Sequence, residues 1–172
     1  APDRFIPIAE EIDMIIPIGQ WVLETAMAQL ADWRAAGATE LRMAVNLSAH
    51  QLRKDTIVSD ITNVLLKHNL GKGALELEIT ESVAMQHPEQ NARLLAELRQ
   101  YGIELAIDDF GTGYSSLSYL KLLPLDRLKL DRSFVKDIEH DPNDAAISAA
   151  TISMSHELGL PVVAEGVENE VH

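Results

Sequence analysis

The sequence contains no cysteine. This absence excludes disulfides, thiolate nucleophiles, thiolate zinc sites and iron-sulfur clusters, and it fits a reducing compartment. No stretch approaches the roughly 18 uninterrupted apolar residues of a membrane-spanning helix, and the first residues begin no apolar segment of a signal peptide. We therefore expect a cytoplasmic domain, which includes the cytoplasmic part of a membrane-anchored protein.

Positive charge is scarce: 14 lysines and arginines stand against 27 aspartates and glutamates, and the net charge is −13. Such a surface repels polyanions, so we expect no nucleic-acid polymer among the partners. The apolar fraction is 47%, and a chain of 172 residues buries roughly two thirds of its unfolded surface. With no linker or low-complexity tract, residues 1–172 are predicted to form a single domain.

Helical patterns alternate with short apolar runs along the chain. The first long helix is expected to start at Pro17 and stop at Gly37, burying a face made by Val22, Ala26, Leu30 and Trp33. Further helices are expected from about Ile57 to Gly71, from Pro88 to Tyr101, and from the Asp141-Pro142 start. The predicted strands are 41–47, 75–79, 103–107, 127–130 and 161–164. Strands separated by helices favour a parallel α/β sheet, either open and doubly wound or part of a (β/α)8 barrel.

Polar residues occupy one alternating phase of these strands, near each carboxyl end. They are Asn46, Glu78, Asp108, Lys129 and Glu165. A single acid at a strand end is usually a helix cap, but five in one phase favour a barrel whose strand ends form a site. Desolvating several carboxylates requires a cation, and Lys129 alone is too little. Oxygen ligands suit Mg²⁺ or Mn²⁺, and the adjacent Asp109 suggests two ions.

A second set of charges lies deeper on the same strand phase and is predicted to form a charge-paired floor. It consists of Arg42, Glu76, Glu104 and Arg127.

Several other chemistries lack their partners in this sequence. The Asp-Phe-Gly triplet at 109–111 comes without the other kinase loops, and Gly111-Thr112-Gly113 lacks the third glycine of a dinucleotide fingerprint. The six histidines have no zinc-protease spacing, and Ser115 and Ser116 have no evident histidine base. A water molecule activated by metal is therefore the best nucleophile.

Five linked motifs resemble the EAL family of bacterial cyclic di-GMP phosphodiesterase domains. They are residues 45–48, 78–82, 108–116, 128–134 and 164–168, within a resemblance that runs from Phe5 to Glu168. The resemblance implies a modified TIM barrel, incomplete in this chain, that hydrolyses cyclic di-GMP to linear pGpG with two Mg²⁺ or Mn²⁺ ions and is inhibited by Ca²⁺. It places the protein in bacterial second-messenger signalling.

The resemblance also implies roles for individual residues. Ligands of the metals would be Asn46, Glu78, Asp108 and Asp109, with Asp108 bridging both ions. Lys129 would orient the water or help to deprotonate it, and Glu165 would be a second-metal ligand or the general base. Glu81 would brace the loop from Asp109 to Ser116. Asp131 and Glu168 would face the substrate or support the metal ligands.

The sequence departs from the family at both ends. The Glu-Ala-Leu segment, with its metal-ligating glutamate, would precede Ala1, and the last strands would follow His172. We therefore expect these 172 residues alone to be inactive and poorly stable, because a ligand is missing and sheet edges are exposed.

Partners and alternative functions can also be stated as expectations. We expect cyclic di-GMP as the ligand, fusion to sensory or GGDEF-type domains, and a homodimer through the apolar residues Tyr114, Leu117, Tyr119 and Leu120. Two alternatives stay open: a catalytically inactive cyclic di-GMP receptor, and a barrel enzyme of the enolase type with a lysine base.

Overall fold

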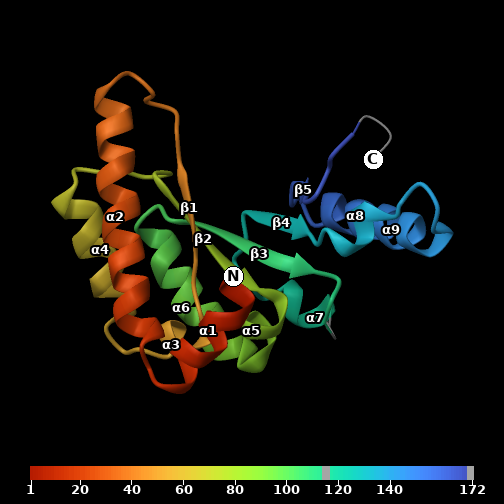
Figure 1. Ribbon diagram of the computed structural model, residues 1–172, viewed down its shortest axis with the longest axis horizontal. Coiled ribbons are helices and arrows are strands. Elements are labelled where there is room, and N and C mark those ends of the chain that lie inside the picture. Colours follow the sequence, from red (N-terminus) through yellow and green to blue (C-terminus); the bar gives the residue numbers. More distant parts are fainter. Residues whose placement is uncertain (114–116, 170–172) are drawn as a thin grey trace. The chain divides into compact units, whose positions relative to one another are not determined.

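The computed structural model describes residues 1–113 and 117–169 (Figure 1). The chain divides into two compact units. One comprises Ala1–Leu77 with Glu97–Glu104, and the other comprises Glu78–Ala96 with Leu105–His172. Each unit is described by itself below.

Helices and strands alternate through most of the chain. The helices are α1 (Pro2–Glu11), α2 (Ile15–Ala35), α3 (Ala49–Leu52), α4 (Ile57–Lys67), α5 (Glu81–Gln86), α6 (Pro88–Gln100), α7 (Leu117–Leu120), α8 (Ser133–Lys136) and α9 (Pro142–Glu157). The strands are β1 (Met43–Asn46), β2 (Leu75–Thr80), β3 (Glu104–Phe110), β4 (Arg127–Leu130) and β5 (Val162–Ala164). Within the described ranges, no helix combines the length and apolarity needed to cross a membrane.

The strands form one sheet in the order β1-β2-β3-β4-β5. Strand β4 pairs in parallel with β3, Ala106 opposite Arg127, and with β5, Leu128 opposite Val162. The expectation of a parallel α/β fold is confirmed, and the five described strands do not close into a barrel. In a parallel sheet the carboxyl ends of the strands share one edge, which is where functional residues gather in α/β folds.

The middle strands are buried because their apolar residues alternate as predicted. Fully buried side chains come from one phase of β2 and β3: Leu75, Leu77, Ile79, Leu105 and Ile107. The opposite phase of β3 carries Ala106 and Asp108, which are also buried. A strand buried on both faces is typical of a parallel sheet covered by helices.

The prediction for the first long helix was wrong in its start and its buried face. Helix α2 begins at Ile15, and its buried residues include Leu23, Met27 and Leu30. Val22 and Trp33, assigned to the core from the sequence, are 38% and 46% exposed. One residue rotates a helix by about 100°, so both Val22 and Leu23 fit a stripe that shares Leu30, and only packing decides between them.

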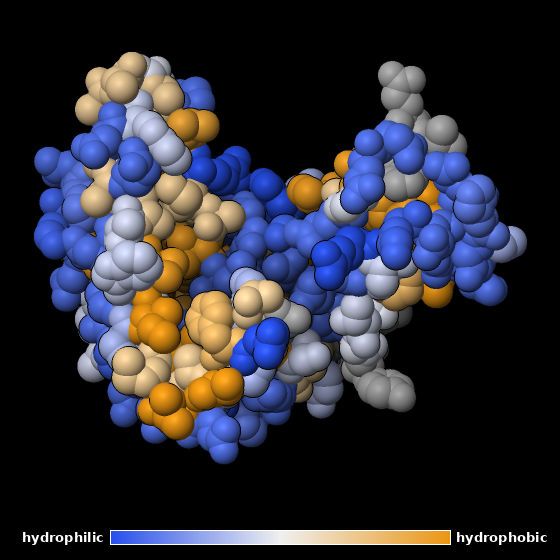
Figure 2. Space-filling model, viewed as in Figure 1, coloured by the Kyte–Doolittle hydropathy of each residue, from blue (hydrophilic) through white to orange (hydrophobic). Residues whose placement is uncertain are grey.

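Helix α1 was not predicted, and it leaves an apolar face uncovered among the described residues. Phe5, Ile8 and Ile12 are exposed, spaced as on one side of a helix. Figure 2 shows apolar side chains gathered at the lower left, over α1 and the start of α2.

Helix α9 buries polar rather than apolar side chains. Its buried residues are Ser148, Thr151 and Ser155, while Ile147 and Ile152 are exposed. The Ser155 hydroxyl donates to the Thr151 carbonyl at 2.7 Å, so its polar atom is satisfied inside the helix itself. Small side chains of this kind let α9 pack closely against β4 and β5.

A charge-paired floor is present in the first unit. Arg42 forms ion pairs with Glu76, at 3.4 Å, and with Glu104. This arrangement confirms the predicted pairing for these three residues. Arg127, the fourth member of the predicted set, begins β4 in the second unit.

At the start of α4, the Asp60 carboxylate is held by two neighbouring side chains. Asp60 accepts hydrogen bonds from the Lys54 ammonium at 2.6 Å and the Thr56 hydroxyl at 3.0 Å, and the Lys54 bond is the main cause of its lowered pKa. We expect Asp60→Asn to lower the free energy of unfolding by about 0.5 kcal/mol at neutral pH. A group whose folded pKa is lowered stabilises above its unfolded pKa of about 3.9, so the difference should vanish as the pH falls through the folded pKa. Urea unfolding at pH 7 and at pH 2.5 measures both values, and an equal difference at the two pH values would contradict the assignment.

Candidate active site

Lys129 stands at the centre of a cluster built by strand ends in the second unit. Its Nζ lies 3.0 Å from Glu78 Oε1, 3.1 Å from Asp108 Oδ1 and 2.6 Å from Glu165 Oε1. Glu78 is on β2, Asp108 on β3, Lys129 on β4, and Glu165 follows β5 directly. The structure thus brings together four of the five polar residues that share one strand phase in the sequence.

Electrostatics keep Lys129 charged. Burial by itself lowers the pKa of its ammonium, but hydrogen bonds to Glu165, Glu78 and Asp108 outweigh burial, and the pKa is raised. In the absence of other cations, Lys129 is therefore the counterion of three carboxylates and cannot serve as a base at neutral pH.

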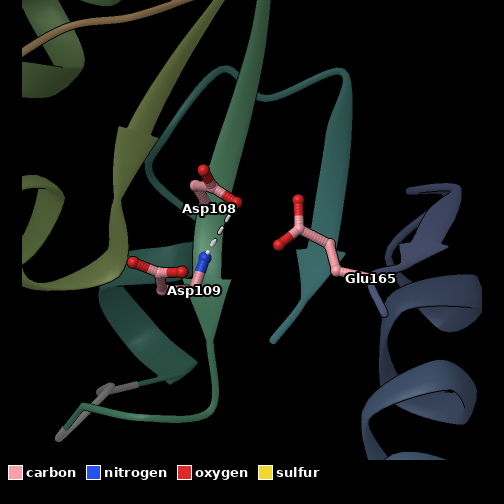
Figure 3. Close-up of side chains that lie close together, drawn as sticks. All are labelled: Asp108, Asp109 and Glu165. Atoms are coloured by element: carbon pink, nitrogen blue, oxygen red, sulfur yellow. Dashed lines mark hydrogen bonds between the residues drawn. The ribbon is translucent and has the colours of Figure 1, made fainter. Parts of the chain in front are cut away.

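Asp109 adds a further carboxylate. Oxygens of Asp108, Asp109 and Glu165 lie within 4.8 Å of one another. In Figure 3 the Asp108 and Glu165 carboxylates face each other from β3 and from the end of β5, with Asp109 beside them. The Asp109 amide donates to Asp108 Oδ1 at 3.1 Å, and Asp109 has a φ of +54°, a left-handed conformation that aspartate tolerates better than most residues.

The environment of Asp109 disfavours its charge. Burial is the largest cause of its raised pKa, followed by repulsion from Asp108, Asp131 and Glu165. A bound cation would reverse this repulsion, because it favours ionised carboxylates.

Asp131 is held in its ionised form by its own loop. Its Oδ1 accepts hydrogen bonds from the Ser133 amide, at 2.9 Å, and from the Ser133 hydroxyl. Although burial opposes ionisation, these bonds, together with Asp109 and Arg132, lower the pKa of Asp131. The Asp-x-Ser spacing at residues 131–133 is itself an Asx-turn signal in the sequence.

The donor set fits a hard divalent cation. The three clustered groups offer only carboxylate oxygens, which are the ligands that Mg²⁺ and Mn²⁺ prefer. Without such an ion, Glu78, Asp108 and Glu165 share the Lys129 ammonium. Asp108, Asp109 and Glu165 are therefore close enough together to hold one metal ion.

Glu81 reaches the loop that follows β3. Its carboxylate accepts hydrogen bonds from the Gly111 amide at 2.7 Å and from the Gly113 amide at 3.4 Å, and the residue is only 1% exposed. The Thr112 hydroxyl donates to the Asp109 carbonyl at 2.8 Å, which closes the turn. Glu81 thus links the start of α5 to the loop beside Asp109. Tyr114, Ser115 and Ser116 lie outside the described residues.

For the cyclic di-GMP hydrolysis that the sequence resemblance implies, we expect Glu81→Gln to reduce turnover by about 10- to 100-fold. The substitution keeps the shape but removes the charge from two hydrogen bonds, and hydrogen bonds to charged groups contribute about 1.5–3 kcal/mol. Steady-state kinetics of Glu81→Gln beside Glu89→Gln, an exposed glutamate on α6, measures the effect. Turnover equal to that of the control would exclude Glu81 as a support of the loop.

The remaining predicted residues do not take part in the contacts of this cluster that are given above. Asn46 ends β1 in the first unit and its side chain is exposed. Glu168 is exposed in the segment after β5. Leu120, assigned to a dimer surface from the sequence, is 1% exposed, so this assignment was wrong: its side chain belongs to the core. Tyr119 is exposed, as expected, while Tyr114 and the side chain of Leu117 lie outside the described residues.

Comparison with known proteins identifies related chains. The model of the EAL domain family matches residues 1–171. The chain is 45% identical over 169 residues to a bifunctional diguanylate cyclase/cyclic di-GMP phosphodiesterase, MucR of Pseudomonas aeruginosa, covering 98% of this chain and 25% of that protein. The chain thus spans about a quarter of that relative's length.

Solved structures agree with this result. A structure described as the PaMucR phosphodiesterase in complex with c-di-GMP matches with a TM-score of 0.96 and 44% identity, over 99% of this chain and 69% of that one. A manganese/cy-diGMP complex of BlrP1 from Klebsiella pneumoniae matches with a TM-score of 0.78 and 34% identity, over 90% of this chain and 39% of that one.

Proposed function

The chain belongs to the EAL domain family, and from this premise we propose that the domain hydrolyses cyclic di-GMP to linear pGpG by two-metal activation of water. The names of its relatives, which include cyclic di-GMP phosphodiesterases, support the substrate and the reaction. The observation that carries the proposal is the convergence of Glu78, Asp108 and Glu165 on Lys129 beside Asp109. An acidic chain needs cations at such a site to accept an anionic dinucleotide.

The metal-holding residues in this proposal come from three strands and their ends. By the resemblance, Asn46, Glu78 and Asp108 would hold one ion, and Asp108 and Asp109 would hold the other. When bound, the two ions, Mg²⁺ or Mn²⁺, neutralise the scissile phosphate and make the attacking water more acidic. The BlrP1 complex with manganese supports this choice of ion.

The other residues of the proposed site act on the attacking water or support the loops around it. Lys129, which contacts three carboxylates, would orient the water. Glu165 is half-buried, with Oε1 2.6 Å from the Lys129 Nζ, and it would accept the proton of the water or hold the second ion. Glu81 keeps the loop after β3 in place, and Asp131 and Glu168 face the substrate or support the ligands.

The proposal extends to partners. Because the chain spans about a quarter of MucR, a protein named for two activities, we propose that this domain is fused to sensory or GGDEF-type domains and acts in the cytoplasm. We also propose a homodimer, with the exposed Tyr119 in the interface between the two copies.

The deciding experiment is an assay of the complete domain, including the Glu-Ala-Leu segment that the resemblance places before Ala1. We expect conversion of cyclic di-GMP to pGpG with Mg²⁺ or Mn²⁺, none with Ca²⁺ or a chelator, and none for Glu78→Ala. Chromatography of the products, with calorimetry of ligand binding, separates the outcomes. Tight binding without product would overturn the enzyme in favour of a receptor, and no binding at all would exclude both.

A further inference from the structure

Two residues of one short segment cover a glycine on each side of the acidic cluster. Gly111, two residues after Asp109, has no room for a side chain, because an ideal Cβ there would lie 2.8 Å from Cε2 of Phe134. Gly166, next to Glu165, is covered in the same way, with an ideal Cβ only 2.9 Å from Cβ of Arg132. Both glycines have positive φ angles, +102° and +72°.

The same segment is joined to both sides by its backbone. The Asp131 amide donates to the Phe110 carbonyl at 3.4 Å, and the Glu165 amide donates to the Leu130 carbonyl at 3.1 Å. Residues 130–134 therefore contact the chain on the Asp109 side and on the Glu165 side through both backbone and side chains.

Phe134 is itself held from behind. Its carbonyl accepts a hydrogen bond from the Ser148 hydroxyl of α9 at 3.2 Å, and the next residue, Val135, is buried in the core. Helix α8 pairs closely with α9. The backbone of Phe134, whose ring lies over Gly111, is thus anchored to a helix outside the cluster.

We propose that Phe134 and Arg132 are positioning residues that set the separation of the Asp109 and Glu165 carboxylates. The proposal rests on the proposed function, because the separation matters for holding divalent cations. Metal-binding groups must be held within about 0.5 Å of their working geometry, and residues that lock them do so by packing. Phe134 acts through Gly111, and Arg132 acts through Gly166, while neither contributes a ligand.

The first test compares Phe134→Ala with Val135→Ala in the complete domain. Val135→Ala is the matched control, because it removes a more deeply buried side chain from the same helix without touching Gly111. We expect Phe134→Ala to weaken Mn²⁺ binding in calorimetry about tenfold. Val135→Ala should leave Mn²⁺ affinity within about twofold although its urea midpoint also falls. Phe134→Tyr, which keeps the ring, should restore the affinity.

The second test uses a readout that needs no metal. The Gly111 amide donates to Glu81, so its hydrogen exchange reports the order of the loop. We expect exchange at Gly111 to accelerate about tenfold or more in metal-free Phe134→Ala, and to stay unchanged relative to the core amides in Val135→Ala. Equal exchange in the two variants, or Mn²⁺ affinity lost equally in both, would overturn the role of Phe134.

Two variants of Arg132 differ only in the Cβ methyl group. Arg132→Ala keeps the Cβ that covers Gly166 and should bind Mn²⁺ like the unmodified domain, whereas Arg132→Gly removes it and should bind several-fold more weakly. A loss of affinity in Arg132→Ala would show that the guanidinium matters instead, against the proposal. If the unmodified domain binds no Mn²⁺, the proposed function fails, and amide exchange at Gly111 and Gly166 still decides whether Phe134 and Arg132 order the two loops.

Discussion

Turnover of cyclic di-GMP is expected to fall about 1,000-fold in Lys129→Ala, while affinity for the dinucleotide stays within a few-fold. The ammonium contacts Glu78, Asp108 and Glu165 together, so in the proposed mechanism it acts on the attacking water rather than on the bases of the substrate. Groups that orient or transfer protons in this way typically contribute 10²- to 10⁴-fold. Kinetics and calorimetry with Ca²⁺ in place of Mg²⁺ measure the two quantities separately.

The same variant should lose stability when no metal is present. Three carboxylates would then lose the ammonium that they share, at a cost of roughly 3 kcal/mol. Since the folded pKa of Lys129 is raised, its stabilisation is complete below the unfolded pKa of about 10.4 and is lost only as the pH rises through the folded pKa. The stability difference should therefore be constant between pH 6 and pH 9. Lys136→Ala, at an exposed lysine of α8, is the control, and matching kinetics in the two variants would remove Lys129 from the mechanism.

Asp108→Asn is expected to change activity and metal-free stability in opposite directions. The substitution keeps an oxygen to accept from the Asp109 amide, but it removes one negative charge from a repelling cluster. We expect Mn²⁺ affinity to fall at least about 100-fold, since even the partners of metal ligands contribute 10- to 100-fold, and turnover to fall below detection. The metal-free domain should be as stable as the unmodified one or more stable, and the raised pKa of Asp109 should move down toward its ordinary value.

Calorimetry with Mn²⁺ and urea unfolding in a chelator give the two readouts. Asp137→Asn, on an exposed aspartate at the end of α8, should change neither. A metal-free Asp108→Asn domain less stable than the unmodified one would show that the contact with Lys129 outweighs the repulsion among the acids.

Sequence periodicity located the strands that carry the site because these strands are strongly patterned. Strand β4 was predicted with its observed limits, and the phase that places Glu78, Asp108, Lys129 and Glu165 on one side follows from the two-residue repeat of a strand. Parallel pairing then brings their carboxyl ends to one edge.

Other features depend on packing that no short-range pattern records. The choice between Val22 and Leu23 on α2 is a rotation of one residue, and the buried serines and threonine of α9 contradict the usual hydropathy rule. The cover of Gly111 by Phe134 joins residues 23 positions apart, and no periodicity links them.

The left-handed backbone of Asp109 limits which sequences can occupy the site. At a φ of +54°, glycine, asparagine and aspartate are the residues that fit with least strain, and of these three aspartate alone carries a charge. Glutamate would supply the carboxylate but would strain the backbone by about 1 kcal/mol and extend the side chain by a methylene. If the proposed function holds, single substitutions at this position give domains that keep the fold and lose catalysis.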